Sequence, residues 1–189
     1  MREIIKLGGV LTLITMCAAG ALANVYLLTR DRIAYVEAAR EEAARKAALP
    51  DAVLFKADST KDGFRFFRAY NDSSANAGVS GFVAMALGKG YSSNIRTFVG
   101  VDLKMKITGI KVAFQQETPG LGTRIEEVKR GEESPWFQDQ FKGKTVEYLE
   151  VVRGKDPERI EAITGATISS EAVAGSVREA VIKLQRVAK

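Results

Sequence analysis

An apolar segment at residues 7–28, which contains no charged side chain, constrains the fold of this chain more than any other feature. A helix rises about 1.5 Å per residue, or roughly 33 Å over this segment, and the hydrocarbon core of a bilayer is about 30 Å thick. The alternative is a cleaved signal peptide, with Arg2 and Lys6 as its basic region and residues 21–23 as its cleavage site. Because the hydrophobic region of a signal peptide reaches only about 15 residues, the segment predicts a membrane anchor helix within residues 1–28.

The stretch that follows the apolar segment is polar and rich in helix-forming residues. Residues 29–49 consist largely of Ala, Glu and Arg and should continue the membrane helix as a stalk. Pro50 should end this helix, since the residue before a proline avoids the helical region. We therefore expect an anchor at 1–28, a helical stalk at 29–50 and one further domain at 51–189.

The orientation of the anchor depends on the charges that flank it. Arg2 and Lys6 precede the apolar segment, and Arg30 and Arg32 follow it, so the positive-inside rule is nearly balanced. The short N-terminal flank favours an N-terminus inside the cell and a folded domain outside it. The expected location is the cytoplasmic membrane, crossed once, with the soluble domain on the outer, periplasmic side.

The composition excludes many kinds of catalytic site. The chain has no His and a single Cys, Cys17, which lies within the apolar segment. The usual zinc sites, intramolecular disulfides and nearly all Ser/His or Cys/His catalytic arrangements are therefore ruled out, and we expect no metal site and no catalytic residue of the protein's own. The net charge is +5, but Lys and Arg are scattered among Asp and Glu, so nucleic acid is not an expected partner. Any chemistry must therefore come from carboxylates, Lys, hydroxyl groups or a bound cofactor.

The pattern of apolar residues in the second domain predicts an α+β fold. Strand-like segments at 64–70, 79–87, 95–103 and 107–114 predict an antiparallel sheet. Short helices are expected at 125–130 and 135–141, and a further strand at 146–152. A C-terminal helix should follow, with an apolar face formed by Val173, Val177, Val181, Leu184 and Ala188.

The segment 161–170 is small, rich in hydroxyl groups and placed directly before that helix. Ser169 or Ser170 is expected to cap the helix, with Glu171 in its first turn. The free N–H groups of a helix N-terminus also offer a seat for a phosphate, to which either serine could donate. The start of an ordinary helix and a phosphate site are both open interpretations of these residues.

The residues Thr164-Gly165-Ala166-Thr167 within this segment resemble the S/T-G-A-T motif of the FMN-binding domain family. The resemblance implies that Thr167 carries FMN through a phosphoester bond, attached by a dedicated flavin transferase. Thr164, Gly165 and Ala166 would then surround the attachment point. Glu161 stands where family members usually have Asp.

A second motif, Glu117-Thr118-Pro119-Gly120-Leu121-Gly122, follows the strand at 107–114. Pro119 fixes one backbone angle and the glycines permit conformations closed to other residues, so the loop has a defined shape or is simply a tight turn. Together with the first motif and the anchor, it resembles the G subunits of Rnf electron-transport complexes, which are related to the C subunit of Na⁺-translocating NADH:quinone oxidoreductase. The resemblance implies that Glu117, Thr118, Gly120, Leu121 and Gly122 form the flavin site with the Thr167 segment.

The function implied by this resemblance is electron transfer inside a membrane complex. The chain would relay electrons through covalent FMN, with other membrane subunits as partners, in an ion-pumping ferredoxin:NAD oxidoreductase. A stand-alone membrane-anchored FMN reductase and an adaptor domain without enzymatic function are the alternatives. Trp136 and Phe141 are expected in the core, although either ring could stack near a flavin.

Overall fold

The computed structural model describes residues 1–60, 63–72 and 78–188, which form two compact units, Met1–Arg40 and Glu41–Lys189. Helix α1 (Arg2–Ala48) supplies the whole of the first unit and ends in the second. Its apolar part is long enough to cross a membrane and its side chains there are exposed, as a lipid-facing helix requires. The helix over residues 7–28 is confirmed. It continues through the expected stalk and ends two residues before Pro50.

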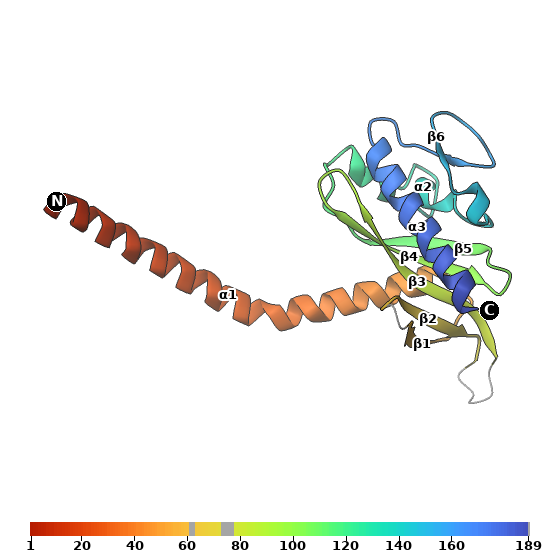
Figure 1. Cartoon of the computed structure of the whole chain (residues 1–189), viewed down its shortest axis with the longest axis horizontal. Helices are drawn as coiled ribbons and strands as arrows, with labels where there is room; N and C mark the ends of the chain where they lie inside the picture. The colour runs from red at the N-terminus through yellow and green to blue at the C-terminus, as the bar shows by residue number, and fades with distance from the viewer. Residues whose placement is uncertain (61–62, 73–77, 189) are drawn as a thin grey trace. The chain divides into compact units, whose positions relative to one another are not determined.

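The second unit is built on a five-stranded antiparallel sheet in the order β1-β2-β3-β4-β5, so each strand pairs with its neighbour in sequence (Figure 1). The strands are β1 (Leu54–Ser59), β2 (Arg65–Tyr70), β3 (Val79–Lys89), β4 (Asn94–Asp102) and β5 (Ile107–Phe114). The α+β class and the antiparallel sheet are confirmed. Strand β1 was not expected, because only three of its six residues are apolar and none of them is buried at this edge of the sheet.

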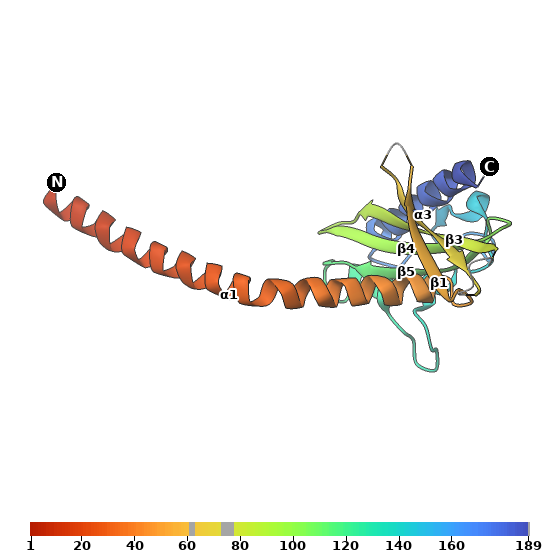
Figure 2. The same ribbon diagram turned by 90° about the horizontal axis from the view of Figure 1, so that it is seen from below.

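The two faces of this sheet are covered by different helices, which lie on opposite sides of it in Figures 1 and 2. Residues 41–48 at the end of α1 cover one face, where Ala44 and Ala48 pack with Phe98. Helix α3 (Thr167–Val187) covers the other, where Val99 lies in the main core. Phe98 and Val99 point to opposite faces because side chains alternate along a strand.

The apolar face expected for the C-terminal helix is mostly confirmed. Val173, Val177, Val181 and Leu184 are buried against the sheet, each with an exposed fraction of 0%. Ala188 is an error in this list, since α3 ends at Val187 and Ala188 is exposed beyond its last turn. At the other end of the helix, buried residues begin in the first turn, next to the loop that precedes α3.

The segment between β5 and α3 contains only short elements. These are the 3₁₀ helices η1 (Gly122–Glu126) and η2 (Val146–Tyr148), helix α2 (Trp136–Asp139), and the parallel strands β6 (Val151–Val152) and β7 (Ile160–Glu161). The helix expected at 125–130 is wrong. The Leu121 N–H donates to the Thr118 carbonyl, and this turn leads into η1, which begins three residues before the expected helix. The expected strand at 146–152 is wrong in its first half, where Tyr148 N–H closes a 3₁₀ turn on the Thr145 carbonyl. The helix expected at 135–141 is present but shorter.

Candidate functional site

The two sequence motifs meet at a cavity of about 590 Å³ in the second unit. Three segments form its walls: the turn between β3 and β4, the loop between β5 and η1, and the start of α3 with the loop before it. The lining residues are Tyr91, Glu117, Thr118, Leu121, Gly122, Gly165, Ala166, Thr167 and Ile168. Seven of these were predicted as site residues. Tyr91 and Ile168 were not, because neither belongs to a motif and only the tertiary structure places them at the cavity.

The carboxylate of Glu117 joins all three walls of the cavity. It accepts hydrogen bonds from the N–H groups of Tyr91, Ser92 and Ser93, at 3.0, 3.1 and 2.9 Å. The hydroxyl groups of Ser93 and Ser169 donate to it as well, at 3.1 and 2.6 Å. Glu117 is 4% exposed, so these five donors replace almost all of its contact with water.

The charge of Glu117 is stabilised by these donors and not by a cation. Burial by itself raises the pKa of this carboxyl group, but the hydrogen bonds from Ser169 and from the three N–H groups outweigh it and hold the pKa below its ordinary value. Among the residues that the structure describes, no Lys or Arg forms an ion pair with Glu117. The group is therefore an ionised carboxylate held in a shell of neutral donors.

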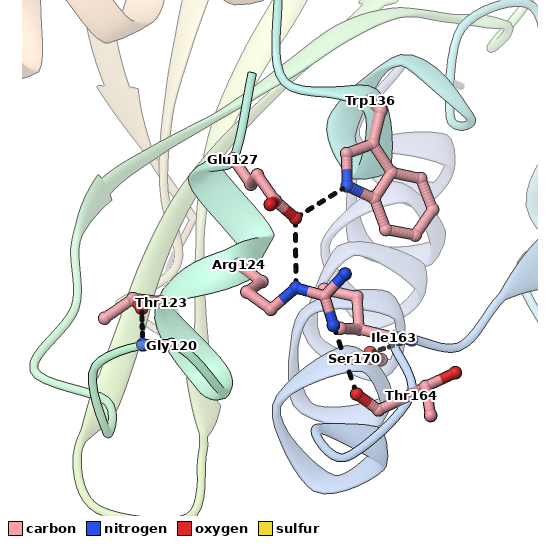
Figure 3. Close-up of polar contacts among 8 residues, drawn as sticks. All are labelled: Gly120, Thr123, Arg124, Glu127, Trp136, Ile163, Thr164 and Ser170. Atoms are coloured by element: carbon pink, nitrogen blue, oxygen red, sulfur yellow. Dashed lines mark hydrogen bonds and ion pairs between the residues drawn. The ribbon is translucent and has the colours of Figure 1, made fainter. Parts of the chain in front are cut away.

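Two glycines of the second motif are required for different reasons. A Cβ atom on Gly122 would lie 2.6 Å from the Cβ of Glu117 and 2.7 Å from the Oγ of Ser169, so a side chain does not fit there. Gly120 has no such neighbour, but its φ of 76° belongs to the left-handed region that glycine adopts most readily. Its N–H donates to the Oγ1 of Thr123 at 3.0 Å, which fixes the loop (Figure 3).

The start of helix α3 differs from the expectation. Ala166 precedes the helix and Thr167 is its first residue, so the prediction that Ser169 or Ser170 caps it is wrong. The turn that Ala166 N–H closes on the Ile163 carbonyl starts the helix earlier than expected. Ser170 is fully buried in the first turn, where its Oγ donates to the Ala166 carbonyl at 3.0 Å. The same Oγ accepts the Ile163 N–H at 3.0 Å (Figure 3).

Thr167 differs from the other hydroxyl residues of the site. Ser169 and Ser170 are buried and bonded within the protein, and neither lines the cavity. The hydroxyl group of Thr118 lies 3.3 Å from that of Ser92, within hydrogen-bonding distance. Thr167 lines the cavity and is partly exposed, and its hydroxyl has no hydrogen-bond partner in the part of the chain that the structure describes. Of the two threonines that line the cavity, Thr167 is therefore the one whose hydroxyl is unbonded within the described residues.

A polar network unforeseen from the sequence supports the loop of Thr164. Arg124 donates from Nη1 to the Thr164 carbonyl at 3.3 Å and from Nε to the carboxylate of Glu127 at 3.0 Å (Figure 3). The same carboxylate accepts the indole N–H of Trp136 at 3.4 Å. The hydrogen bond from Arg124 is the main cause that holds the pKa of Glu127 below its ordinary value. The exposed Thr164 thus helps to position the loop through its backbone and does not line the cavity.

The two aromatic residues considered for stacking lie elsewhere. Phe141 is fully buried and packs edge-on against Phe137 with ring centroids 5.7 Å apart, as expected for the core. Trp136 is half-buried, packs against the core and lies under the ammonium group of Lys129, 3.9 Å from the ring centroid. Neither residue lines the cavity.

The cavity suits a flat aromatic ring that carries a phosphate. Its rim exposes three apolar side chains, Tyr91, Leu121 and Ile168, with exposed fractions of 73%, 47% and 51%. Beside them, the first turn of α3 offers backbone N–H groups without intrahelical acceptors, which favour an anion. A heteroaromatic nucleotide presents both of these surfaces, so the donor set and the volume fit a flavin mononucleotide.

Comparison with protein families points in the same direction. Residues 90–182 match the family described as FMN-binding domain, and residues 1–47 match that described as RnfG N-terminal region. The FMN-binding match contains every residue that lines the cavity.

Two curated relatives span nearly the whole chain. The G subunit of the ion-translocating oxidoreductase complex of Aliivibrio fischeri is 36% identical, over 91% of this chain and 86% of that protein. The G subunit of the Na(+)-translocating ferredoxin:NAD(+) oxidoreductase complex of Acetobacterium woodii is 31% identical, over 100% of this chain and 95% of that protein. A solved structure, the C subunit of the Na(+)-translocating NADH-quinone reductase of Parabacteroides distasonis, aligns with a TM-score of 0.51 and 22% identity, over 67% of this chain and 63% of that one. This last similarity concerns the fold alone.

Proposed function

The chain belongs to the family of G subunits of ion-translocating oxidoreductase complexes, and from this premise we propose that it relays electrons through FMN bound between the two motifs. It is a membrane-anchored subunit, and other subunits of an Rnf-type complex are its partners. The reaction of the whole complex is electron transfer between ferredoxin and NAD⁺ coupled to ion transport. When bound, the flavin supplies the redox chemistry, and this chain binds, orients and shields it.

FMN is attached covalently in this proposal, through a phosphoester bond to Thr167. The observation that carries this step is the free hydroxyl of Thr167, which lies in the cavity wall at the first residue of α3. The phosphate of such an ester retains one negative charge, and the N-terminus of a helix stabilises a negative charge. Thr167 is thus placed where an attached phosphate gains from the helix.

Attachment requires a flavin transferase and an activated flavin nucleotide as donor. The Oγ1 of Thr167 forms a bond to phosphorus, the bond from phosphorus to the leaving group of the donor breaks, and the hydroxyl proton is released.

Glu161, at the end of β7, lies outside the cavity in a separate hollow beside Trp136 and Gln140. The Glu161 N–H donates to the side chain of Gln140 at 2.7 Å, which fixes the strand that leads into the Thr167 loop.

The remaining motif residues hold the ring of the flavin. Leu121 and Ile168 offer apolar contact to the ring, and Thr118 offers a hydroxyl at its edge. Gly122 and Gly165 bring unhindered backbone to the cavity wall. Gly120, Thr164 and Ser170 act behind the wall, through the hydrogen bonds that shape the two loops.

The soluble domain lies on the outer side of the membrane in this proposal. This orientation is compatible with the absence of Cys from residues 41–189, since an exported domain meets an oxidising compartment. A covalent bond is useful there, because FMN lost outside the cell is not readily replaced. The exposed rim of the cavity would by itself let the flavin dissociate, and the covalent bond to Thr167 prevents this loss.

A denaturing gel scanned for flavin fluorescence tests the attachment. Native-host membranes should show a fluorescent band at 20.5 kDa, and peptide mass analysis should find FMN on Thr167. Thr167→Ala should abolish the fluorescence and leave the domain folded, because the change removes a hydroxyl and no core volume. Ile168→Ala is a matched control, since it removes a neighbouring cavity side chain and leaves the hydroxyl. A fluorescent Thr167→Ala band, or a dark wild-type band in a host with the transferase, would refute the attachment.

A further inference from the structure

Glu117 has a property that binding of the flavin does not require. Its carboxylate lies in the cavity wall and is 4% exposed, yet both oxygen atoms are taken up by groups of the protein. A residue that bound the ring through its side chain would leave an oxygen atom free to accept a hydrogen bond from it. Glu117 therefore contributes something other than a direct polar contact.

The hydrogen-bond shell fixes Glu117 in its charged form. Three backbone N–H groups, those of Tyr91, Ser92 and Ser93, can only donate, and they converge on the two oxygen atoms. Protonation would place a hydrogen atom on one of these oxygens, facing the N–H groups that donate to it. At least one donor would then be left without an acceptor. The hydroxyl of Ser169 adds another donor at 2.6 Å. The negative charge is thus a fixed feature of the cavity wall at neutral pH.

No neighbouring cation cancels this charge. Arg124, seven residues after Glu117, pairs with Glu127 and donates to a backbone carbonyl, and no ion pair to Glu117 occurs within the described ranges. The donors around Glu117 are neutral, so they stabilise the carboxylate without removing its net charge. In a site with little water, a unit charge acts over several ångströms more strongly than it does at the surface.

We propose that Glu117 lowers the reduction potential of the flavin by placing an uncompensated negative charge beside it. An electron that enters the ring without a proton adds negative charge next to an existing one, which favours the oxidised state. The same carboxylate ties the walls together, so the charge stays at a fixed place relative to the ring. This inference rests on the proposed binding of FMN in the cavity and concerns how readily the flavin gives up its electrons.

The full chain with its flavin, purified in detergent from the native host, allows a direct test by spectroelectrochemical titration. Glu117→Gln removes the charge and should raise the midpoint potential. A tenfold change in the equilibrium constant of a one-electron step corresponds to a shift of about 59 mV. Glu117→Asp shortens the side chain and disturbs the same hydrogen bonds but keeps the charge, so its potential should stay near that of the wild type. Equal shifts in both variants, or no shift in Glu117→Gln, would overturn the proposal.

A further variant covers the case in which Glu117→Gln does not fold. Ser169→Ala keeps the charge of Glu117 and removes the hydroxyl that points at it, so less of the negative potential is offset. Its midpoint potential should fall or stay unchanged, and a rise would count against the proposal. The flavin content of every native sample is measured from its visible absorbance before the titration. Wild-type protein without flavin would refute the proposed function, whereas loaded variants with the wrong order of potentials would refute only the role of Glu117.

Discussion

Gly122 lies so close to Glu117 and Ser169 that even a methyl group should disrupt the cavity wall. In Gly122→Ala, the new Cβ would lie 2.6 Å from the Cβ of Glu117, 2.7 Å from the Oγ of Ser169 and 2.8 Å from the Oε2 of Glu117. Contacts below 3.0 Å do not persist, so the Glu117 side chain or the loop must move. Overpacking of this kind costs about 1–3 kcal/mol.

The movement also weakens a charged hydrogen bond. The Ser169 hydroxyl donates to Glu117 at 2.6 Å, and hydrogen bonds to charged groups contribute about 1.5–3 kcal/mol. Because the two effects overlap, we expect Gly122→Ala to lower the free energy of unfolding by about 3 kcal/mol. Flavin loading should fall with it, since the displaced loop forms one wall of the cavity.

Gly120→Ala is the matched control, made two residues away in the same loop. A Cβ on Gly120 meets no atom within 4 Å, so the only penalty is the left-handed backbone, about 1–2 kcal/mol. Urea unfolding of the detergent-solubilised chain, followed by fluorescence of its single Trp, measures both values. If Gly122→Ala cost no more than Gly120→Ala, the close packing around Glu117 would not constrain the site, and the reasoning would be wrong.

Three other predictions concern stability. Ser170→Ala should cost about 1–3 kcal/mol in thermal unfolding, because the buried Ile163 N–H loses its acceptor; an unchanged melting temperature would contradict this. Phe141→Ala should cost about 3–5 kcal/mol in urea, as a fully buried ring is removed, and a cost below about 1 kcal/mol would place Phe141 outside the core. The pKa of Glu117 is lower in the folded than in the unfolded chain, so its contribution is present above the ordinary glutamate pKa and is lost as pH falls through the lower, folded value. Stability of the wild type should therefore drop more steeply below about pH 4 than that of Glu117→Gln, and parallel pH profiles would contradict it.

The main elements of the fold are readable from the sequence because their patterns are local. The apolar segment at 7–28 has one stable conformation in a bilayer, a helix, and Pro50 follows soon after the end of that helix in the structure. Strands such as β4 and β5 follow from short runs rich in β-branched and aromatic residues, and the buried face of α3 follows from spacings of three and four residues. Short elements such as η1 and η2 were missed, since a single hydrogen bond in a turn decides them.

The tertiary structure alone decided how the motifs form a site. The motifs predicted most of the residues at the cavity, including Thr167, but they did not reveal that Glu117 accepts hydrogen bonds from Ser169, 52 residues away, and from the turn after β3. They also suggested a cap at Ser169 or Ser170, where the structure has buried hydroxyls that hold the loop together. Local propensity concerns neighbours along the chain, whereas the ionised carboxylate at the cavity exists only because folding brings donors from distant segments to the same point.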